Sequence, residues 1–162
     1  GGEMRKLLLL AFITAFALTG CVSMQRSARR TEILHSWTEK KVYDAPLDTH
    51  WPRVRQYFFT QGYTSRTGDE QAGYNLETDW QVDEYERNRL LIQGIPANDN
   101  KGCRFVITRM TETRDTQGQK QQEFSARDLE LEWLLWQHLN PEDAQFHHDK
   151  AQEHATQEIT DG

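Results

Sequence analysis

The sequence predicts an α+β domain in which an antiparallel sheet carries helices packed on one face, in the order β-α-β-β-β-β-β-α. Two observations lead to this fold class. Apolar residues recur at helical spacing in two segments, one early and one late in the chain, and between those segments they alternate with polar residues. Alternation indicates strands with one buried face and one wet face, which is typical of antiparallel sheets.

The first strand is expected over residues 39–44, and the first helix over residues 49–61. Asp48 is a good N-cap residue for this helix, and Gly62 suits the position just after its end. The apolar side chains of the segment fall on one helical face: Leu47, Trp51, Val54 and Phe58. We therefore expect this helix to pack a single stripe against the sheet.

Five further strands are expected between the two helices. They cover residues 63–67, 73–82, 89–94, 103–113 and 120–124. The second of these five places one set of side chains toward the core: Tyr74, Leu76, Thr78, Trp80 and Val82. The last two strands form a hairpin across the turn at residues 115–118, where Gly118 is a turn residue.

The last helix is predicted from the capping-box spacing of Ser125 and Asp128, and Asn140-Pro141 ends it. Seven large apolar residues between Leu129 and Leu139 exceed what one sheet-facing stripe buries. We therefore expect part of this helix to form a surface for a partner or ligand, through Leu129, Leu131, Trp133, Leu135, Trp136 and Leu139. The alternative is that both tryptophans belong to the core.

Residues 141–162 are polar and are expected to form a partly disordered tail, in which Pro141 could open a short helix. His147, His148 and His154 are metal-ligating residue types. A transition-metal site needs ligands held in fixed geometry, which a solvated tail does not provide. No metal site is therefore predicted.

A charged and then apolar leader opens the chain. Arg5 and Lys6 precede an apolar run over residues 7–18, the order found in secretory signal peptides. The run is shorter than the roughly 20 residues that cross a bilayer. The four residues that follow, Leu18-Thr19-Gly20-Cys21, resemble the lipobox of bacterial lipoproteins. The resemblance implies cleavage before Cys21, acylation of its thiol and acylation of the new amino terminus.

These boundaries divide the chain into four parts. Residues 1–20 are the expected signal peptide, with residues 1–3 as extra residues before Met4. Residues 21–37 are a lipidated tether, residues 38–140 form the α+β domain, and residues 141–162 form the tail. In lipoproteins of this kind, the residue after the lipidated cysteine affects sorting, and an Asp there resembles an inner-membrane retention signal. Here that residue is Val22, so we expect the periplasmic side of the outer membrane, with the inner membrane as the alternative.

Cys103 lies on an alternating segment, and with Cys21 acylated it has no partner for a disulfide within the chain. We expect a buried thiol; an intermolecular disulfide or a nucleophile are the alternatives. A nucleophilic site requires a base within hydrogen-bond reach. The sequence places neither His35 nor His50 against Cys103, and it has no Gly-x-Ser-x-Gly elbow. We therefore expect a protein that is not an enzyme and that needs no cofactor.

Three short motifs resemble the helix-grip domains of BamC, a lipoprotein component of the outer-membrane β-barrel assembly machine. They are Trp51-Pro52-Arg53-Val54, Gly62-Tyr63, and the strand from Gly73 to Trp80 with Leu76 and Thr78. The resemblance covers residues 40–82 by pattern and residues 40–139 by element order, and it implies a helix-grip fold and an outer-membrane location. BamC has two such domains and a long lipidated arm, whereas this chain has room for one domain and a short tether.

The chain is acidic, with a net charge of −6, and this disfavours nucleic acid as a partner because phosphate binding needs clustered Lys and Arg. The sequence thus favours a membrane-anchored, non-enzymatic module that binds protein partners in envelope or outer-membrane protein assembly. The alternative is a carrier or sensor of a small apolar ligand, held between helix and sheet by Tyr74, Leu76, Trp80 and Trp133 or Trp136.

Overall fold

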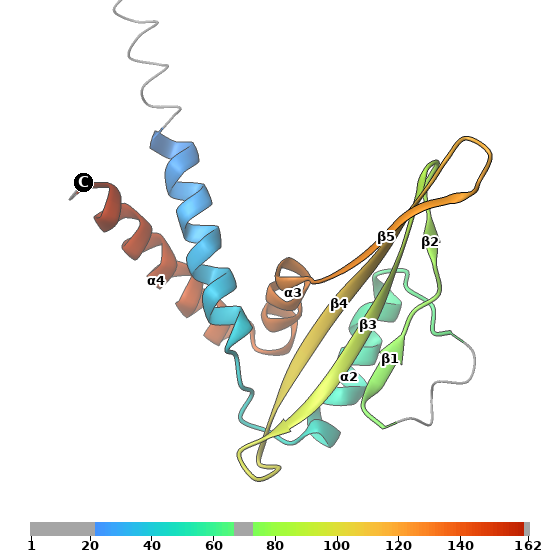
Figure 1. Cartoon of the computed structure of the whole chain (residues 1–162). Helices are drawn as coiled ribbons and strands as arrows, with labels where there is room; N and C mark the ends of the chain where they lie inside the picture. The colour runs from blue at the N-terminus through green and yellow to red at the C-terminus, as the bar shows by residue number, and fades with distance from the viewer. Residues whose placement is uncertain (1–21, 67–72, 161–162) are drawn as a thin grey trace, which may run out of the picture. The chain divides into compact units, whose positions relative to one another are not determined.

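The computed structural model describes residues 22–66 and 73–160, which fall into two compact units. The larger unit spans Trp37–Ala144, and the smaller one takes the residues on either side of it. The elements in chain order after the N-terminal helix are α2 (Leu47–Thr60), β1 (Asn75–Glu77), β2 (Gln81–Val82), β3 (Glu86–Ala97), β4 (Gly102–Arg114), β5 (Lys120–Arg127), α3 (Leu129–Leu139) and α4 (Pro141–Thr160) (Figure 1).

The sheet is open and antiparallel, which confirms the predicted α+β class. Its strand order is β1-β3-β4-β5, and β2 pairs with the start of β3, at Arg87 and Asn88. β3 and β4 pair along their whole length, from Glu86 with Thr113 to Ala97 with Gly102. Both strands are longer than the expected 89–94 and 103–113, and residues 98–100 between them take left-handed backbone angles, which Asn and Asp tolerate and which reverse the chain tightly.

Three predicted strands are shorter than expected. Residues 39–44 contribute an isolated bridge between Tyr43 and Cys103, because the N-terminal helix continues to residue 39. Of residues 63–67, Ser65 makes an isolated bridge with Thr78, and residue 67 lies outside the described part of the chain. The expected strand 73–82 is divided into β1 and β2.

α2 packs the predicted stripe inward, since Val54 and Phe58 are fully buried. Its first turn differs from the prediction, because Pro46 is the N-cap residue and Asp48 instead accepts a hydrogen bond from the Tyr74 hydroxyl. The C-terminus of α2 is as expected, because Gly62 follows the end of the helix. Gly62 has a φ of 89°, and the N–H groups of residues 62 and 63 bond back to the carbonyls of residues 59 and 58, a Schellman motif.

Gly94 allows α2 to approach the sheet closely. A Cβ atom at this position would lie 2.6 Å from Leu47 Cδ2 and 2.9 Å from the Cβ of Tyr74. Both distances are shorter than a van der Waals contact. The Leu47 methyl group can turn aside, but the Cβ of Tyr74 moves only with its backbone, so a larger residue at position 94 would displace the chain at Tyr74. The start of α2 and the end of β3 are thus in direct contact at this glycine.

α3 begins three residues later than the capping-box prediction. β5 continues through Arg127, so Ser125 is a strand residue and Asp128 is the N-cap. One carboxylate oxygen of Asp128 accepts from the Leu131 N–H at 2.9 Å, and the other accepts from Arg109 Nε at 2.7 Å. The residue predicted as the acidic end of the capping box is therefore the cap itself.

The described part of the expected tether is helical, and the expected tail is also helical rather than partly disordered, which corrects that prediction. The N-terminal helix covers residues 22–39, and α4 runs through most of the predicted tail. In the smaller unit, Arg29 pairs with Glu158, Arg30 Nη1 donates to Gln152 Oε1 at 2.9 Å, and Leu34 is buried. The opposite order of these contacts along the two helices indicates antiparallel packing.

The full length of α4 was not predicted because the residues that it buries at helical spacing, Ala151 and Ala155, are small. An alanine stripe within a polar segment gives a weak apolar signal, although alanine favours helix strongly. Cys21, the predicted lipidation site, lies outside the described residues. In the part of the chain that is described, no helix is long and apolar enough to cross a membrane.

Candidate functional site

The side chains predicted to form a partner or ligand surface on α3 are packed in the core, so they offer little exposed surface to a partner. Five of the six expected residues are buried and Leu129 is half-buried; the buried ones are Leu131, Trp133, Leu135, Trp136 and Leu139. α3 contacts α2 on one side and β4 on another. A helix enclosed on more than one side buries a wider surface than one sheet-facing stripe, so the apolar excess is structural.

The start of α4 covers a further part of α3. Trp136 Nε1 donates to Asp143 Oδ2 at 2.8 Å, and Lys41 Nζ contacts the same carboxylate oxygen at 2.5 Å. The Lys41 ammonium also lies 4.5 Å from the centroid of the Trp136 ring. Trp133 meets Trp136 edge to face at 5.3 Å between ring centroids. This cluster holds three segments together around one buried indole.

Cys103 is a fully buried free thiol, as predicted. Burial raises the pKa of this thiol to about 11, the opposite of the lowered pKa that activates a nucleophilic cysteine. His50 contacts the rings of Tyr43 and Phe105, and burial lowers its pKa. Among the residues that the structure describes, no group of three or more His, Cys, Asp or Glu side chains is placed to hold a metal ion.

Two of the residues expected to enclose a small ligand together, Leu76 and Trp80, have different surroundings. Leu76 is buried in the core, whereas Trp80 lies against Arg87 and Arg89. The irregular backbone between β1 and β2 breaks the alternation on which the prediction depended. Trp80 is therefore separated from the core residues with which it was grouped.

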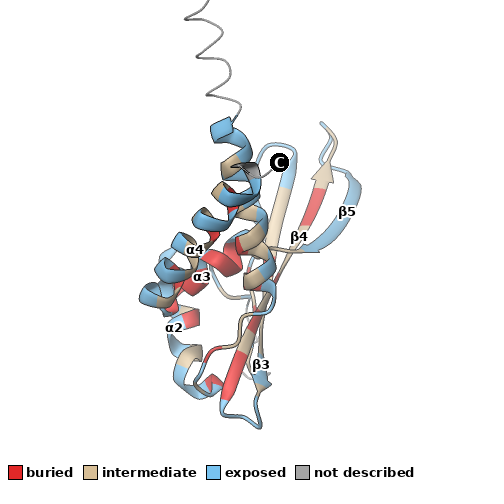
Figure 2. Ribbon diagram, turned by 90° about the vertical axis from the view of Figure 1, so that its left-hand side faces the viewer, coloured by how far each residue is buried: buried red, intermediate tan, exposed pale blue. Residues whose placement is uncertain are grey.

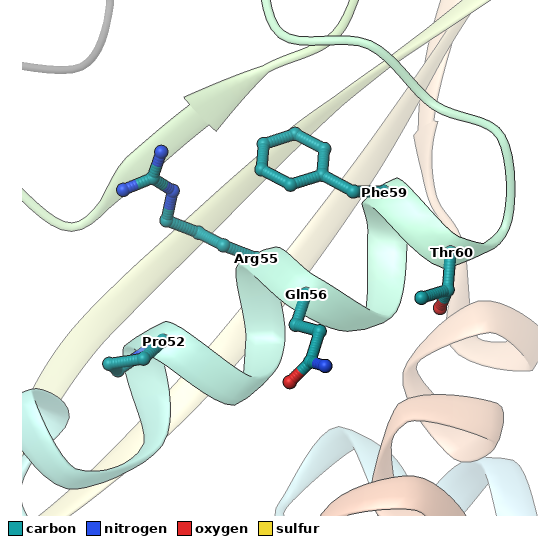
Figure 3. Close-up of a pocket in the computed structure, with 5 residues that line it drawn as sticks. All are labelled: Pro52, Arg55, Gln56, Phe59 and Thr60. Atoms are coloured by element: carbon teal, nitrogen blue, oxygen red, sulfur yellow. The ribbon is translucent and has the colours of Figure 1, made fainter.

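A hollow of about 440 Å³ lies on the outer surface of α2 (Figure 3). All five of its lining residues come from that helix: Pro52, Arg55, Gln56, Phe59 and Thr60. Four of the five are exposed, and the Arg55 guanidinium lies 5.7 Å from the centroid of the Phe59 ring. It is a surface hollow beside one helix, and it lies away from the interior site that the sequence suggested.

The most distinctive surface is the side of the sheet that faces away from α2 and α3, which we call the helix-free face. Leu90, Ile92 and Ile107 are fully buried toward the helices. Their neighbours along β3 and β4 therefore point to the opposite side. Figure 2 shows α2 and α3 on one side of the strands. The helix-free face carries Trp80, Arg87, Arg89, Leu91, Ile95, Arg104, Val106, Met110, Glu112 and Arg114.

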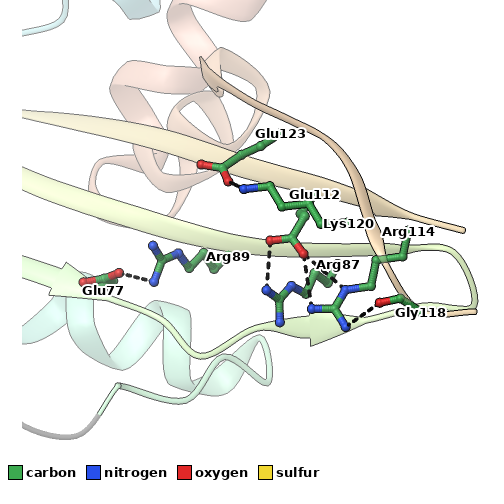
Figure 4. Close-up of polar contacts among 8 residues, drawn as sticks. All are labelled: Glu77, Arg87, Arg89, Glu112, Arg114, Gly118, Lys120 and Glu123. Carbon is green, nitrogen blue, oxygen red and sulfur yellow. Dashed lines mark hydrogen bonds and ion pairs between the residues drawn. The ribbon is translucent and has the colours of Figure 1, made fainter.

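A buried carboxylate organises one end of this face. The side chain of Glu112 is 4% exposed and accepts from Arg87 Nη2 at 2.8 Å and from Arg114 Nε at 3.2 Å (Figure 4). The hydrogen bond from Arg87 is the main reason that the pKa of Glu112 is lowered, and Arg114 adds to it. Nearer the centre, Glu77 pairs with both Arg89 and Arg66.

Trp80 is held between two arginines. The Arg87 and Arg89 guanidinium carbons lie 4.3 and 4.7 Å from the centroid of its ring. Both distances fall within the range of cation–π attraction. Because each arginine also binds a glutamate, the ring and both guanidinium groups are fixed by several contacts at once.

The rest of the helix-free face is apolar and incompletely covered. Leu91, Val106 and Met110 are half-buried on neighbouring strands, and Ile95 is 43% exposed. This combination of an apolar centre, a fixed aromatic ring and surrounding arginines is suited to binding, and it matches the composition of protein interfaces.

No known protein family, curated protein or solved structure matches this chain. Apolar periodicity does not mark the helix-free face, because its most distinctive residues are arginines. A signal was present in the segment Glu86-Arg87-Asn88-Arg89, where arginines alternate immediately before an apolar strand. Arginines at every second position of a strand occupy the same face, and they indicated a charged side to the sheet.

Proposed function

We propose that this chain is a lipoprotein anchored through Cys21 on the periplasmic side of the outer membrane. In this proposal it acts as a non-enzymatic protein-interaction module in envelope or outer-membrane protein assembly. The observation that carries the interaction role is the helix-free face, where half-buried apolar side chains lie beside Trp80 and its two arginines. Aromatic residues and arginine are the residue types enriched in protein interfaces.

The leader and the lipobox resemblance support the anchor, and the resemblance to BamC supports the same location. Residues 22–39, which follow Cys21 in the sequence, are helical.

Complementation of a strain that lacks this protein tests the proposal. Wild type is expected in the membrane fraction with an acylated N-terminal peptide, and Cys21→Ala in the soluble fraction without acyl mass. Because two or three acyl chains are needed for stable anchoring, losing them should release nearly all of the protein. A Cys21→Ala variant that stays in the membrane fraction, with no acyl mass on wild type, would contradict the anchor.

The assembly role has a second readout in the same strains, the amount of folded β-barrel protein in the outer membrane. We expect the deletion to lower it and wild type to restore it. Met110→Glu, which places a charge at the centre of the helix-free face, should restore it poorly. Phe124→Glu is the matched control, because Phe124 is 57% exposed and pairs with Thr111 on the helix-bearing side of the sheet. Unchanged barrel levels in the deletion strain would refute the assembly role.

A further inference from the structure

The helix-free face is basic although the chain as a whole is acidic. The chain has 25 acidic and 19 basic side chains. By contrast, this face and its margin carry six basic side chains against three glutamates, which are Glu77, Glu112 and Glu123; the basic residues are Arg66, Arg87, Arg89, Arg104, Arg114 and Lys120. Lys120 and Glu123 on β5 pair with each other, and the acidic turn at residues 83–84 lies at one end.

The carboxylates of Glu77 and Glu112 do not bind all the N–H donors of these arginines. Glu112 serves both Arg87 and Arg114, and Glu77 serves both Arg66 and Arg89. Arg104 donates from Nη2 to the backbone carbonyl of Glu39 at 2.9 Å. Each guanidinium group has five N–H donors in a fixed planar arrangement, so one carboxylate shared by two arginines leaves room for further carboxylate ligands.

We propose that the helix-free face binds an amphipathic helix of another envelope protein, one that carries acidic residues on both sides of an apolar stripe. This partner assignment rests on the proposed interaction function and adds its chemistry. The apolar stripe would cover Leu91, Val106 and Met110, completing a second helical layer on the sheet. The flanking acidic residues would meet the arginines at the margin.

The arrangement of the arginines favours a protein partner over a membrane surface. Basic residues that bind anionic headgroups do so as clusters of cations beside apolar groups that enter the lipid. Here Arg87 and Arg89 lie against Trp80 and bind glutamates, and Leu91, Val106 and Met110 are half-buried within a sheet face. These fixed donors are suited to carboxylates presented at defined positions.

The direct test is binding of a designed helical peptide of about 18 residues, or five turns, with a leucine stripe flanked by glutamates. The protein is the chain from residue 21 onward with Cys21→Ser, and a peptide with lysine in place of each glutamate is the control. We expect the glutamate peptide to bind at least about tenfold more tightly, and raising the salt from about 0.05 to 0.5 M to weaken it severalfold, since salt screens exposed charges. Equal binding of the two peptides would overturn the proposal.

Two exposed positions on opposite sides of the sheet locate the binding. Ile95→Glu is expected to weaken the glutamate peptide about tenfold, the equivalent of 1.4 kcal/mol. Phe124→Glu, on the helix-bearing side, should change it less than twofold. Both residues are exposed, so both variants should keep the fold, as circular dichroism will show. Equal losses in the two variants would place the binding elsewhere and refute the assignment.

Vesicles containing about one-third anionic lipid form the third arm, with the unlipidated protein as the ligand. We expect no binding to them and no competition with the peptide. Vesicle binding that Ile95→Glu abolishes would replace the protein partner with a membrane surface. If the glutamate peptide does not bind the purified protein but Met110→Glu still impairs barrel assembly in cells, the acidic partner is refuted and the proposed function stands. If the peptide does not bind and Met110→Glu leaves barrel assembly unchanged, both proposals are refuted.

Discussion

Replacing Glu132 by alanine is expected to lower the free energy of unfolding by about 2–3 kcal/mol, because it removes a buried, charged acceptor of three hydrogen bonds. Glu132 is 3% exposed and accepts three hydrogen bonds. Its Oε1 accepts from the Ile107 N–H at 2.9 Å and from Arg127 Nε at 2.8 Å, and its Oε2 accepts from Arg127 Nη2 at 2.8 Å. The substitution leaves a strand N–H and a guanidinium group without this acceptor.

Urea unfolding of two further variants checks this explanation. Glu132→Gln retains an acceptor for Ile107 but loses the charge, so it should cost less than the alanine variant. Glu130→Ala, an exposed position on the same helix, should cost at most about 1 kcal/mol. If Glu132→Ala is no more destabilising than Glu130→Ala, then the hydrogen bonds that Glu132 accepts from Ile107 and Arg127 do not stabilise the fold as inferred.

Trp136→Ala is expected to destabilise the domain by about 3–5 kcal/mol, the usual cost of truncating a buried tryptophan. The side chain is 1% exposed, and its removal opens a cavity between α3 and the start of α4. It also leaves Asp143 without the indole donor that lies at 2.8 Å. Thermal and urea unfolding both measure the loss.

Leu134→Ala is the matched control, because Leu134 lies on the same helix but is 39% exposed. It should cost less than about 1 kcal/mol, as surface substitutions usually do. Trp136→Phe keeps most of the ring and removes the donor, so its cost should lie between those of the other two variants. Equal stability of Trp136→Ala and Leu134→Ala would show that α3 is not enclosed as described.

Periodicity predicted the parts of the fold that depend on apolar side chains alone. The stripe of α2 and its glycine C-terminus were predictable because Val54, Phe58 and Gly62 act through local geometry. The same reasoning misassigned α3. A count of apolar residues cannot tell how many neighbours enclose a helix, and α3 contacts α2 as well as β4.

Contacts between distant polar residues were beyond sequence reasoning. Glu132 satisfies a strand N–H that lies 25 positions earlier in the chain, and no local pattern marks this. Trp80 was predicted to face the core by alternation, but the irregular backbone after β1 places it beside Arg87 and Arg89. The helix-free face therefore depends on a change of strand geometry that the alternating sequence conceals.

The central claim is that this protein contacts its partners through the helix-free face. The most direct measurement is photocrosslinking in intact cells from a photoreactive residue placed at Ile95 or at Phe124, both of which are exposed. We expect discrete crosslinked products from position 95, mapping to acidic helical segments, and few or none from position 124. Products of equal yield from both positions, or from position 124 alone, would contradict it.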